Sequence, residues 1–162
     1  RERRHMTAVT IRTKGVAIRT FNLHLEAGAT PSDVSNANVW ASHWESIYRA
    51  YAQRVAESPS PQWARKVVLG DFNARMTGDA YQARFIAPFY SVPGQANSVD
   101  PLDFKEADGA ALNTFPSAAP SKKVDYIFVP RSWAVSTRRP VVTDSDHLPL
   151  DGTLAVPGVG SP

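Results

Sequence analysis

Two polar side chains that could bind a metal ion or a phosphate follow an apolar run near the middle of the chain. Val67-Val68-Leu69 leads into Gly70, and Asp71 and Asn73 come next, two residues apart. In extended backbone, residues i and i+2 point to the same side, so a strand through Phe72 would present Asp71 and Asn73 to one ligand. An Asp/Asn turn at the end of a strand explains the same residues without any chemistry. This stretch alone leaves both interpretations open.

A second polar pair lies near the end of an earlier strand-like run. Residues Val16–Leu25 are rich in apolar side chains, and Asn22 and His24 lie two apart within them. The pair therefore shares one face of the predicted strand. A lone histidine in a strand is more often a hydrogen-bonded structural residue than a functional one, so His24 by itself is weak evidence for a functional role.

Asp125 is a carboxylate inside an apolar run. Within Lys123–Val129, alternation places Asp125 on the same face as Ile127 and Val129. A carboxylate on an apolar face is costly unless it is paired. We therefore expect Asp125 to have a partner, such as a histidine.

The elements that must position these residues follow from the periodicity of the chain. Two extended runs, Met6–Arg12 and Val16–Leu25, flank Lys14-Gly15 and predict a β-hairpin. Apolar residues at steps of three and four predict an amphipathic helix, capped at Ser32 or Asp33, that carries Trp40, Trp44, Ile47, Tyr48, Tyr51 and Val55. The order strand, helix, strand suggests a crossover into Lys66–Gly70. Further predictions are a helix over Thr77–Phe89 and strands over Lys123–Val129, Ala134–Val142 and Leu148–Val156.

Residues 91–122 are rich in Pro, Gly, Ser, Asp and Ala and predict long loops, with a small helix near Pro101–Ala107. Asn113-Thr114-Phe115-Pro116 within them could contact a ligand, and a turn packed by Phe115 explains that motif equally well.

Length and composition indicate one globular domain, over 1–156, with a flexible tail at 157–162. The 162 residues are 43% hydrophobic, and the net charge of +3 is permissive of anionic partners without indicating nucleic acid. Since the chain has no cysteine, any metal must be held by oxygen or imidazole ligands, which favours hard cations. No apolar stretch is long enough to span a bilayer, so we expect a soluble chain. The compartment stays open, and secretion would need a signal on a segment missing from this sequence.

Four short motifs together resemble a known family. They are Asn22-Leu23-His24-Leu25, Gly70-Asp71-Phe72-Asn73, Asp125-Tyr126-Ile127-Phe128 and Ser145-Asp146-His147. In order and in character they resemble the endonuclease/exonuclease/phosphatase superfamily, the deoxyribonuclease I-like proteins, with Leu23 in place of the usual Thr. Each motif is moderately specific, and their common order makes chance resemblance improbable.

The resemblance implies an α+β fold, the deoxyribonuclease I-like α/β/β/α sandwich, of which this chain would supply roughly the C-terminal half. A complete member begins with a half that carries a strand-borne Asn and a metal-binding Glu, and neither motif is found ahead of His24. We therefore expect an N-terminal half, as a separate or cleaved polypeptide, to pack on an inner sheet face that this chain leaves open.

The resemblance also implies roles for single residues. The expected catalytic residues are His24, Asp71, Asn73, Asp125 and His147. Substrate contacts are expected from Asn22, Asn73 and Asn113, and metal contacts from Asp146 and Asp71. The oxygen ligands favour Mg²⁺, with Mn²⁺ or Ca²⁺ as alternatives.

The implied activity is metal-dependent hydrolysis of a phosphodiester by activated water. A nuclease is the first expectation and a phospholipid-directed, sphingomyelinase-like enzyme the second. A non-catalytic binding or assembly module is the alternative from another class. Arg131, Arg138 and Arg139 could bind a nucleic-acid backbone, although a solvated strand edge explains them at least as well.

Overall fold

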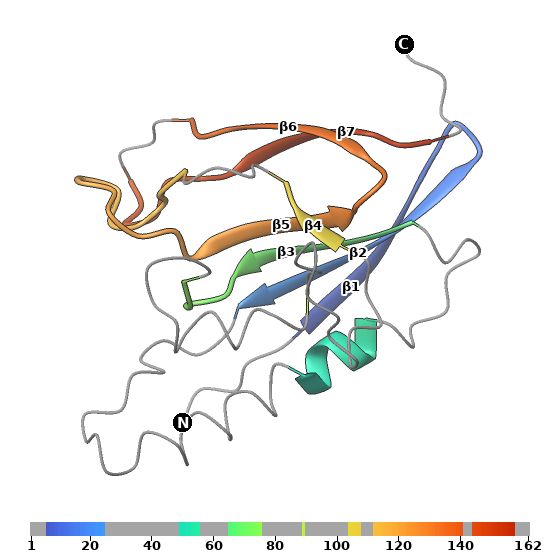
Figure 1. Ribbon diagram of the computed structural model, residues 1–162, viewed down its shortest axis with the longest axis horizontal. Helices are drawn as coiled ribbons and strands as arrows, with labels where there is room; N and C mark the ends of the chain where they lie inside the picture. Colours follow the sequence, from blue (N-terminus) through green and yellow to red (C-terminus); the bar gives the residue numbers. More distant parts are fainter. Residues whose placement is uncertain are drawn as a thin grey trace.

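A computed structural model describes residues 6–24, 49–55, 65–75, 89, 104–107, 112–140 and 144–157, and the fold is defined by these residues. Their strands form two sheets (Figure 1). Five strands follow the order β1-β2-β3-β5-β4, and β6 and β7 form a separate antiparallel ribbon. The strands are β1 Met6–Thr13, β2 Val16–His24, β3 Lys66–Asp71, β4 Phe104–Glu106, β5 Asp125–Pro130, β6 Ala134–Arg138 and β7 Asp151–Ala155.

The predicted hairpin is confirmed. β1 and β2 pair antiparallel from Met6↔Leu23 to Thr13↔Val16. The two turn residues, Lys14 and Gly15, both have positive φ, 46° and 77°. A two-residue turn of this kind matches the twist of the strands it joins, which is why it closes hairpins.

The predicted crossover is also confirmed, because β2 and β3 are parallel neighbours, from Arg19↔Lys66 to His24↔Asp71. Of the predicted amphipathic helix, residues 49–55 are described and are helical. The rest of that helix, with Trp40, Trp44, Ile47, Tyr48 and the proposed cap at Ser32 or Asp33, lies outside the described residues.

One face of the five-stranded sheet packs against the helical segment 49–55. Ala52 and Val55 from the helix share a buried cluster with Phe21, Val68 and Phe128 from the strands. Phe72 is fully buried in the same cluster, with edge-to-face ring contacts to Phe89, Tyr126 and Phe128 at centroid distances of 5.1 to 5.7 Å. Each such side chain stabilises the fold by about 1.5–3 kcal/mol on burial.

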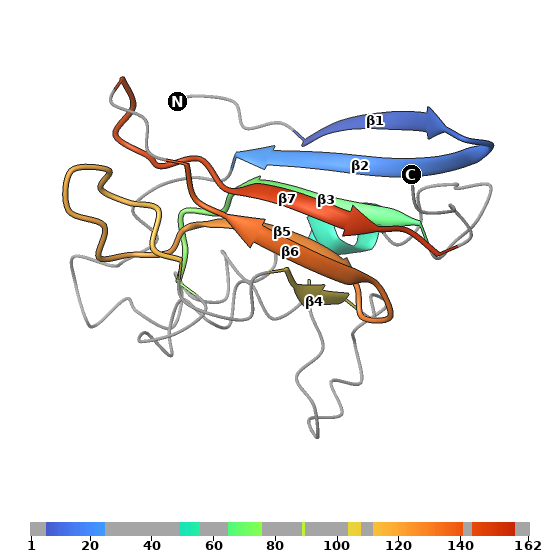
Figure 2. The ribbon, with the colours of Figure 1, turned by 90° about the horizontal axis from the view of Figure 1, so that it is seen from above.

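The β6–β7 ribbon covers part of the opposite face (Figure 2). A second buried cluster forms there from Val16, Ile18, Val67, Ile127, Val129 and Trp133, with Val135 and Leu154 of the ribbon packed on it. The expectation of an open inner face is therefore wrong for this part of the sheet, because the same chain supplies its cover. On β1 the large hydrophobic residues Val9 and Ile11 stay 53% and 50% exposed.

Several predicted elements differ from the structure in type or in bounds. The small helix near Pro101–Ala107 is wrong over 104–106, which form β4 and pair antiparallel with the end of β5. Phe104 is buried there, and a tertiary pairing of this kind outweighs weak local preference. The last strand begins at Asp151 rather than Leu148, and β6 ends at Arg138.

The remaining predictions lie largely outside the described residues, including the helix over 77–88, most of the loop at 91–111 and the tail beyond residue 157. Within the described part of the chain, no helix is long and apolar enough to cross a membrane.

Candidate active site

Three of the predicted site residues form one row across three neighbouring strands. His24 at the end of β2 pairs with Asp71 at the end of β3, and Asp71 pairs with Asp125 at the start of β5. Residues opposite one another in a sheet share a face. The row lies on the sheet face that the ribbon covers. Each of its residues is an even number of positions from Ile18, Val67 or Ile127 on the same strand, and these three residues are buried beneath the ribbon. The apolar face thus ends in a polar edge.

Gly70 permits β2 and β3 to approach closely beside this row. Its φ is +134°, a conformation that side-chain-bearing residues rarely adopt. A Cβ placed on Gly70 would lie 1.9 Å from the carbonyl oxygen of Leu23. The glycine of the Gly-Asp-Phe-Asn motif is therefore required by the packing of the two strands.

Asp71 and Asn73 meet through a turn. The strand ends at Asp71, and Asn73 has a positive φ of 49°. Of the two interpretations, a strand through Phe72 is therefore wrong, and the Asp/Asn turn is the one present. The backbone N–H of Asn73 donates to Asp71 Oδ1 (2.8 Å), and Asn73 Nδ2 donates to Asp71 Oδ2 (3.1 Å). Asn tolerates this conformation and Asp closes the turn with its side chain. The turn still places both polar side chains together while Phe72 enters the core.

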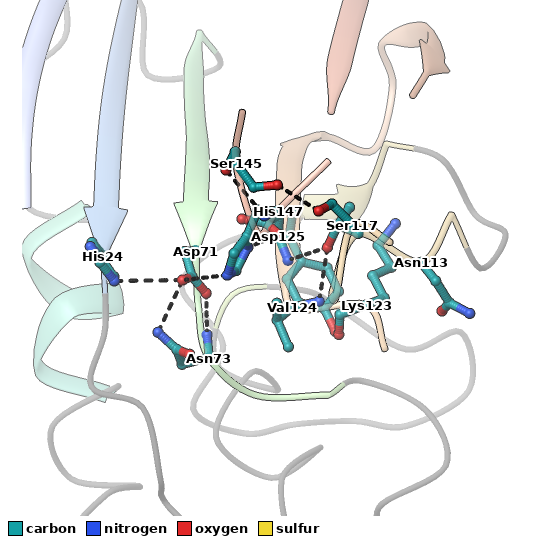
Figure 3. Close-up of polar contacts among 12 residues, drawn as sticks. His24, Asp71, Asn73, Asn113, Ser117, Lys123, Val124, Asp125, Ser145 and His147 are labelled. Atoms are coloured by element: carbon teal, nitrogen blue, oxygen red, sulfur yellow. Dashed lines mark hydrogen bonds and ion pairs between the residues drawn. The ribbon is translucent and has the colours of Figure 1, made fainter. Parts of the chain in front are cut away.

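His147 joins the row from the loop before β7 (Figure 3). Its Nδ1–H donates to Asp125 Oδ2 (2.9 Å), so the partner expected for Asp125 is His147. Its Nε2 lies 3.9 Å from Asp71 Oδ2, and His24 Nε2 lies 3.5 Å from the same oxygen. Asp71 is therefore flanked by two imidazoles. His24 is the accessible one, with 61% of its side chain exposed against 26% for His147.

The surroundings raise two pKa values. Burial by desolvation is the main cause that raises the pKa of Asp71, and the charge of Asp125 adds to it, against the lowering effects of the Asn73 amide and the two histidines. For His147, burial lowers the pKa, but the hydrogen bond and charge of Asp125 and the charges of Asp71 and Asp146 outweigh it, so the pKa is raised. A carboxylate that holds an imidazole in this way fixes its tautomer and favours its charged form.

Asp71, Asp125 and His147 could hold a metal ion. One ligand atom from each lies within 4.8 Å of the others. Two half-buried carboxylates that repel each other, one with a raised pKa, form a donor set that fits a hard divalent cation. His147 would offer such an ion its Nε2, because its Nδ1 is held by Asp125.

Three predicted residues lie outside this group. Asn22 is exposed on β2, two residues before His24 and on the same face. Asp146 is exposed beside His147, and its charge helps to raise the pKa of His147. Asn113 is turned away, with its Nδ2 donating to the carbonyl of Pro120 (3.4 Å), and Figure 3 shows it beyond Lys123 and Val124 from Asp71.

The three arginines considered as contacts for a nucleic-acid backbone have partners within the chain. Arg131 donates to the carbonyl of Phe104, Arg138 pairs with Asp151 across the ribbon at 2.7 Å, and Arg139 donates to the carbonyl of Asn113. These contacts favour a structural role for the three arginines.

Several contacts that hold the site were not assigned from the sequence. The hydroxyl of Thr114 accepts from the start of β5, and Ser145 Oγ accepts from the N–H of His147 (3.1 Å). The ring of Phe115 lies against the imidazole of His147, at a centroid distance of 4.9 Å. The Asn-Thr-Phe-Pro motif was the available signal, and its partners are too distant in sequence to be read from it.

No family model matches the chain, and no curated protein is similar to it in sequence. Solved structures are similar in fold. An endonuclease/exonuclease/phosphatase family protein from Leptotrichia buccalis is 15% identical with a TM-score of 0.57, and the match covers 93% of this chain and 54% of that one. TDP2 from D. rerio, complexed with a single-strand DNA product, is 15% identical with a TM-score of 0.56 and coverages of 94% and 62%. Sphingomyelinase C from Streptomyces griseocarneus is 18% identical with a TM-score of 0.51 and coverages of 92% and 56%.

These matches show the fold. The chain has the deoxyribonuclease I-like fold of the endonuclease/exonuclease/phosphatase proteins, and the resemblance predicted from its motifs is confirmed at that level. It spans between 54% and 62% of the length of these three structures, as expected for a chain that carries part of the sandwich.

Proposed function

We propose that the chain carries the catalytic edge of a metal-dependent phosphodiesterase that hydrolyses P–O bonds with activated water. The observation that carries this proposal is the row of His24, Asp71 and Asp125, completed by His147. It brings a carboxylate, a carboxylate–imidazole pair and a second imidazole to one edge of a sheet. These are the groups that activate water and stabilise charge in phosphoester hydrolysis.

Asp71 is the proposed base or orienting group for the attacking water. Its raised pKa makes it a better proton acceptor than an ordinary aspartate, since the proton it receives is held more tightly. Asn73 donates to both oxygens of this carboxylate and thereby fixes its plane. In this proposal the amide of Asn73 also helps to position the water and the phosphate.

His147 is the proposed contact to the scissile phosphate. Asp125 holds its Nδ1–H, which leaves Nε2 directed toward Asp71 and the space where substrate would bind. The raised pKa favours the imidazolium, which attracts phosphate oxygens. His24 is exposed and is proposed to donate to a phosphate oxygen or to the leaving group, with Asn22 as a further contact on the same face. Asn113 could contact only a substrate that extends well beyond this group, because its amide is turned toward Pro120.

A divalent cation, most simply Mg²⁺ with Mn²⁺ or Ca²⁺ as alternatives, would supply charge stabilisation at the phosphate and the leaving oxygen. Asp71 and Asp146 are the proposed ligands from this chain. Asp125 lies close enough to share the site, and its carboxylate is also needed to hold His147.

A nucleic acid is the favoured substrate, and a phospholipid is the second. The nucleic-acid proposal is supported by the similarity in fold to TDP2, which has been seen with a single-strand DNA product. The similarity to a sphingomyelinase C of the same fold supports the lipid alternative. The permissive net charge of +3 is compatible with both anionic substrates.

We further propose that an N-terminal half, as a separate or cleaved polypeptide, completes the sandwich. Two observations support this. The chain spans little more than half of the matched structures, and the ribbon leaves Val9 and Ile11 exposed on the same sheet face that it covers elsewhere. The polypeptide encoded directly upstream of Arg1 is the candidate. A Val9→Ser/Ile11→Ser variant should lose co-purification with it, whereas Ala134→Ser, an exposed change on β6, should not. A stable monomer with a closed core and no such association would contradict this part of the proposal.

The activity test is hydrolysis of a chromogenic phosphodiester, with and without Mg²⁺ and with and without the co-expressed upstream polypeptide. We expect metal-dependent turnover with the upstream polypeptide and little without it. An inactive reconstituted protein that binds Mg²⁺ would favour the binding or assembly module. Single-stranded oligonucleotides and sphingomyelin vesicles then separate the nuclease from the phospholipid-directed enzyme.

A further inference from the structure

Thr114 is a fully buried polar residue beside the Asp125–His147 pair. None of its surface is exposed, and its hydroxyl oxygen accepts from the backbone N–H groups of Val124 and Asp125, at 3.4 Å each. A hydroxyl taken out of water costs free energy unless it is hydrogen-bonded. These contacts therefore hold the backbone at the point where β5 begins and where the Asp125 carboxylate is anchored.

The backbone of Thr114 reaches the other member of the pair. Its carbonyl accepts from the N–H of Leu148 (2.8 Å), the residue that follows His147. Its own N–H donates to the carbonyl of Lys122 (2.8 Å), which fastens it to the chain leading into β5. Thr114 is thus hydrogen-bonded at once to the segment that carries Asp125 and to the segment that carries His147.

The residues that follow Thr114 strengthen the attachment of the His147 loop. Ser117 donates from its N–H to the carbonyl of Asp146 (2.7 Å) and from its hydroxyl to the carbonyl of Ser145 (Figure 3). Phe115 packs its ring against the imidazole of His147. The loop is therefore held on both sides of His147, at Ser145 and Asp146 and again at Leu148.

We propose that Thr114 is a positioning residue of this site, whose hydroxyl and carbonyl together hold Asp125 and His147 at hydrogen-bonding distance. The proposal rests on the proposed phosphodiesterase function for its catalytic meaning. Its structural content, the geometry of the Asp125–His147 pair, does not depend on that function. Asp125 and His147 are 22 residues apart in sequence, and they lie on segments that do not belong to one strand pair. A link between the two segments is needed to set their separation.

The hydroxyl distinguishes this role from simple filling of space. Valine has nearly the shape of threonine and lacks only the acceptor, so Thr114→Val leaves the N–H groups of Val124 and Asp125 without it. Serine keeps the acceptor and loses a methyl group. A packing role predicts that Thr114→Ser is the more harmful change, and a positioning role predicts that Thr114→Val is.

The experiment compares Thr114→Val, Thr114→Ser and wild type in the 162-residue chain itself, with Thr137→Val on β6 as the matched control. Only the kinetic readout needs the upstream polypeptide. The first readout is the NMR signal of the His147 Nδ1–H, which reports its hydrogen bond to Asp125 and needs no activity. We expect this signal to move in Thr114→Val and to stay in place in Thr114→Ser and Thr137→Val. Hydrogen exchange of the Asp125 amide should accelerate only in Thr114→Val.

The second readout is kinetic. Removing a contact that orients a catalytic group typically costs about 10- to 100-fold, and we expect that loss in the kcat of Thr114→Val, with KM changed less than kcat. An unmoved His147 signal in Thr114→Val would overturn the proposal, whether or not the protein hydrolyses phosphodiesters. If Thr114→Val does not fold, the serine variant decides. A His147 signal in Thr114→Ser that is displaced as far as in Asp125→Asn would overturn the proposal, and a signal at its wild-type position supports it. Absence of hydrolysis in wild type would count against the proposed function and leave the NMR result intact.

Discussion

Asp71 and Asp125 are direct partners across the antiparallel pair of β3 and β5, and the imidazole of His147 contacts both carboxylates. The two carboxylates therefore have different surroundings despite their shared row. Asp125 receives the Nδ1–H of His147, while Asp71 receives both N–H groups of Asn73. Asp125 orients an imidazole, and Asp71 is held by the Asn73 turn and lies between the imidazoles of His24 and His147.

Replacing Asp125 should uncouple His147 from the site. In Asp125→Asn the negative charge that raises the pKa of His147 is lost, and only a neutral amide oxygen is left to accept its Nδ1–H, so its pKa should fall. An NMR titration of the metal-free protein measures this. Turnover of the reconstituted enzyme should fall by about 10²- to 10⁴-fold, the usual contribution of a positioned acid or base. A His147 pKa that stays at its wild-type value would show that Asp125 does not act on it.

Replacing Asp71 should separate activity from stability. Asp71→Asn keeps the size of the side chain and removes a half-buried charge whose desolvation raises the pKa of Asp71. This gain offsets the loss of one of the two acceptors for Asn73, so the variant should unfold at a temperature close to that of wild type. Its hydrolytic activity should be lost. Asp151→Asn is the control, because its pair with Arg138 is exposed and contributes about 0–1 kcal/mol. Retained activity in Asp71→Asn would exclude Asp71 as the water-activating group.

The raised pKa of His147 predicts a pH dependence of stability. The folded protein holds the proton more tightly than the unfolded chain, whose value lies near 6.5. The stabilisation is therefore fully present below the unfolded pKa and is lost as pH rises through the folded pKa. In metal-free protein, the free energy of unfolding measured in urea should be higher for wild type than for His147→Gln, and by a larger margin at pH 5.5 than at pH 8.5. A difference that grows with pH would have the wrong sign.

Gly70→Ala should destabilise the sheet at the site. The added methyl group would lie 1.9 Å from the carbonyl oxygen of Leu23, and the φ of +134° is strained for alanine. Both strands must shift, and we expect a loss at the upper end of single mutations, about 4–5 kcal/mol. Gly15→Ala is the matched control, because nothing lies within 4 Å of its added methyl group. It should cost only about 1–2 kcal/mol for its positive φ. If Gly70→Ala and Gly15→Ala lost the same free energy of unfolding in urea, the close approach of β2 and β3 would be unimportant for stability.

Local patterns in the sequence determined the hairpin, the crossover, the two faces of β5 and the order of the four motifs. The hairpin and the two faces of β5 depend on neighbours within a few residues, and the crossover and the motif order depend on the succession of elements along the chain. Alternation separates Tyr126 and Phe128 from Asp125, Ile127 and Val129. The structure buries Tyr126 and Phe128 in one cluster and Ile127 and Val129 in the other. The need of Asp125 for a partner followed from burial alone.

Tertiary structure decided which residues meet. His24, Asp71 and Asp125 align because of the register of three strands, and His147 reaches them only through the docking of its loop on Thr114 and Ser117. The short strand β4 forms because it pairs with the edge of β5. The backbone turns at Asn73 because the side chain of Asp71 accepts from the N–H of Asn73. These outcomes depend on contacts between segments distant in sequence, whose free energy a local pattern does not contain.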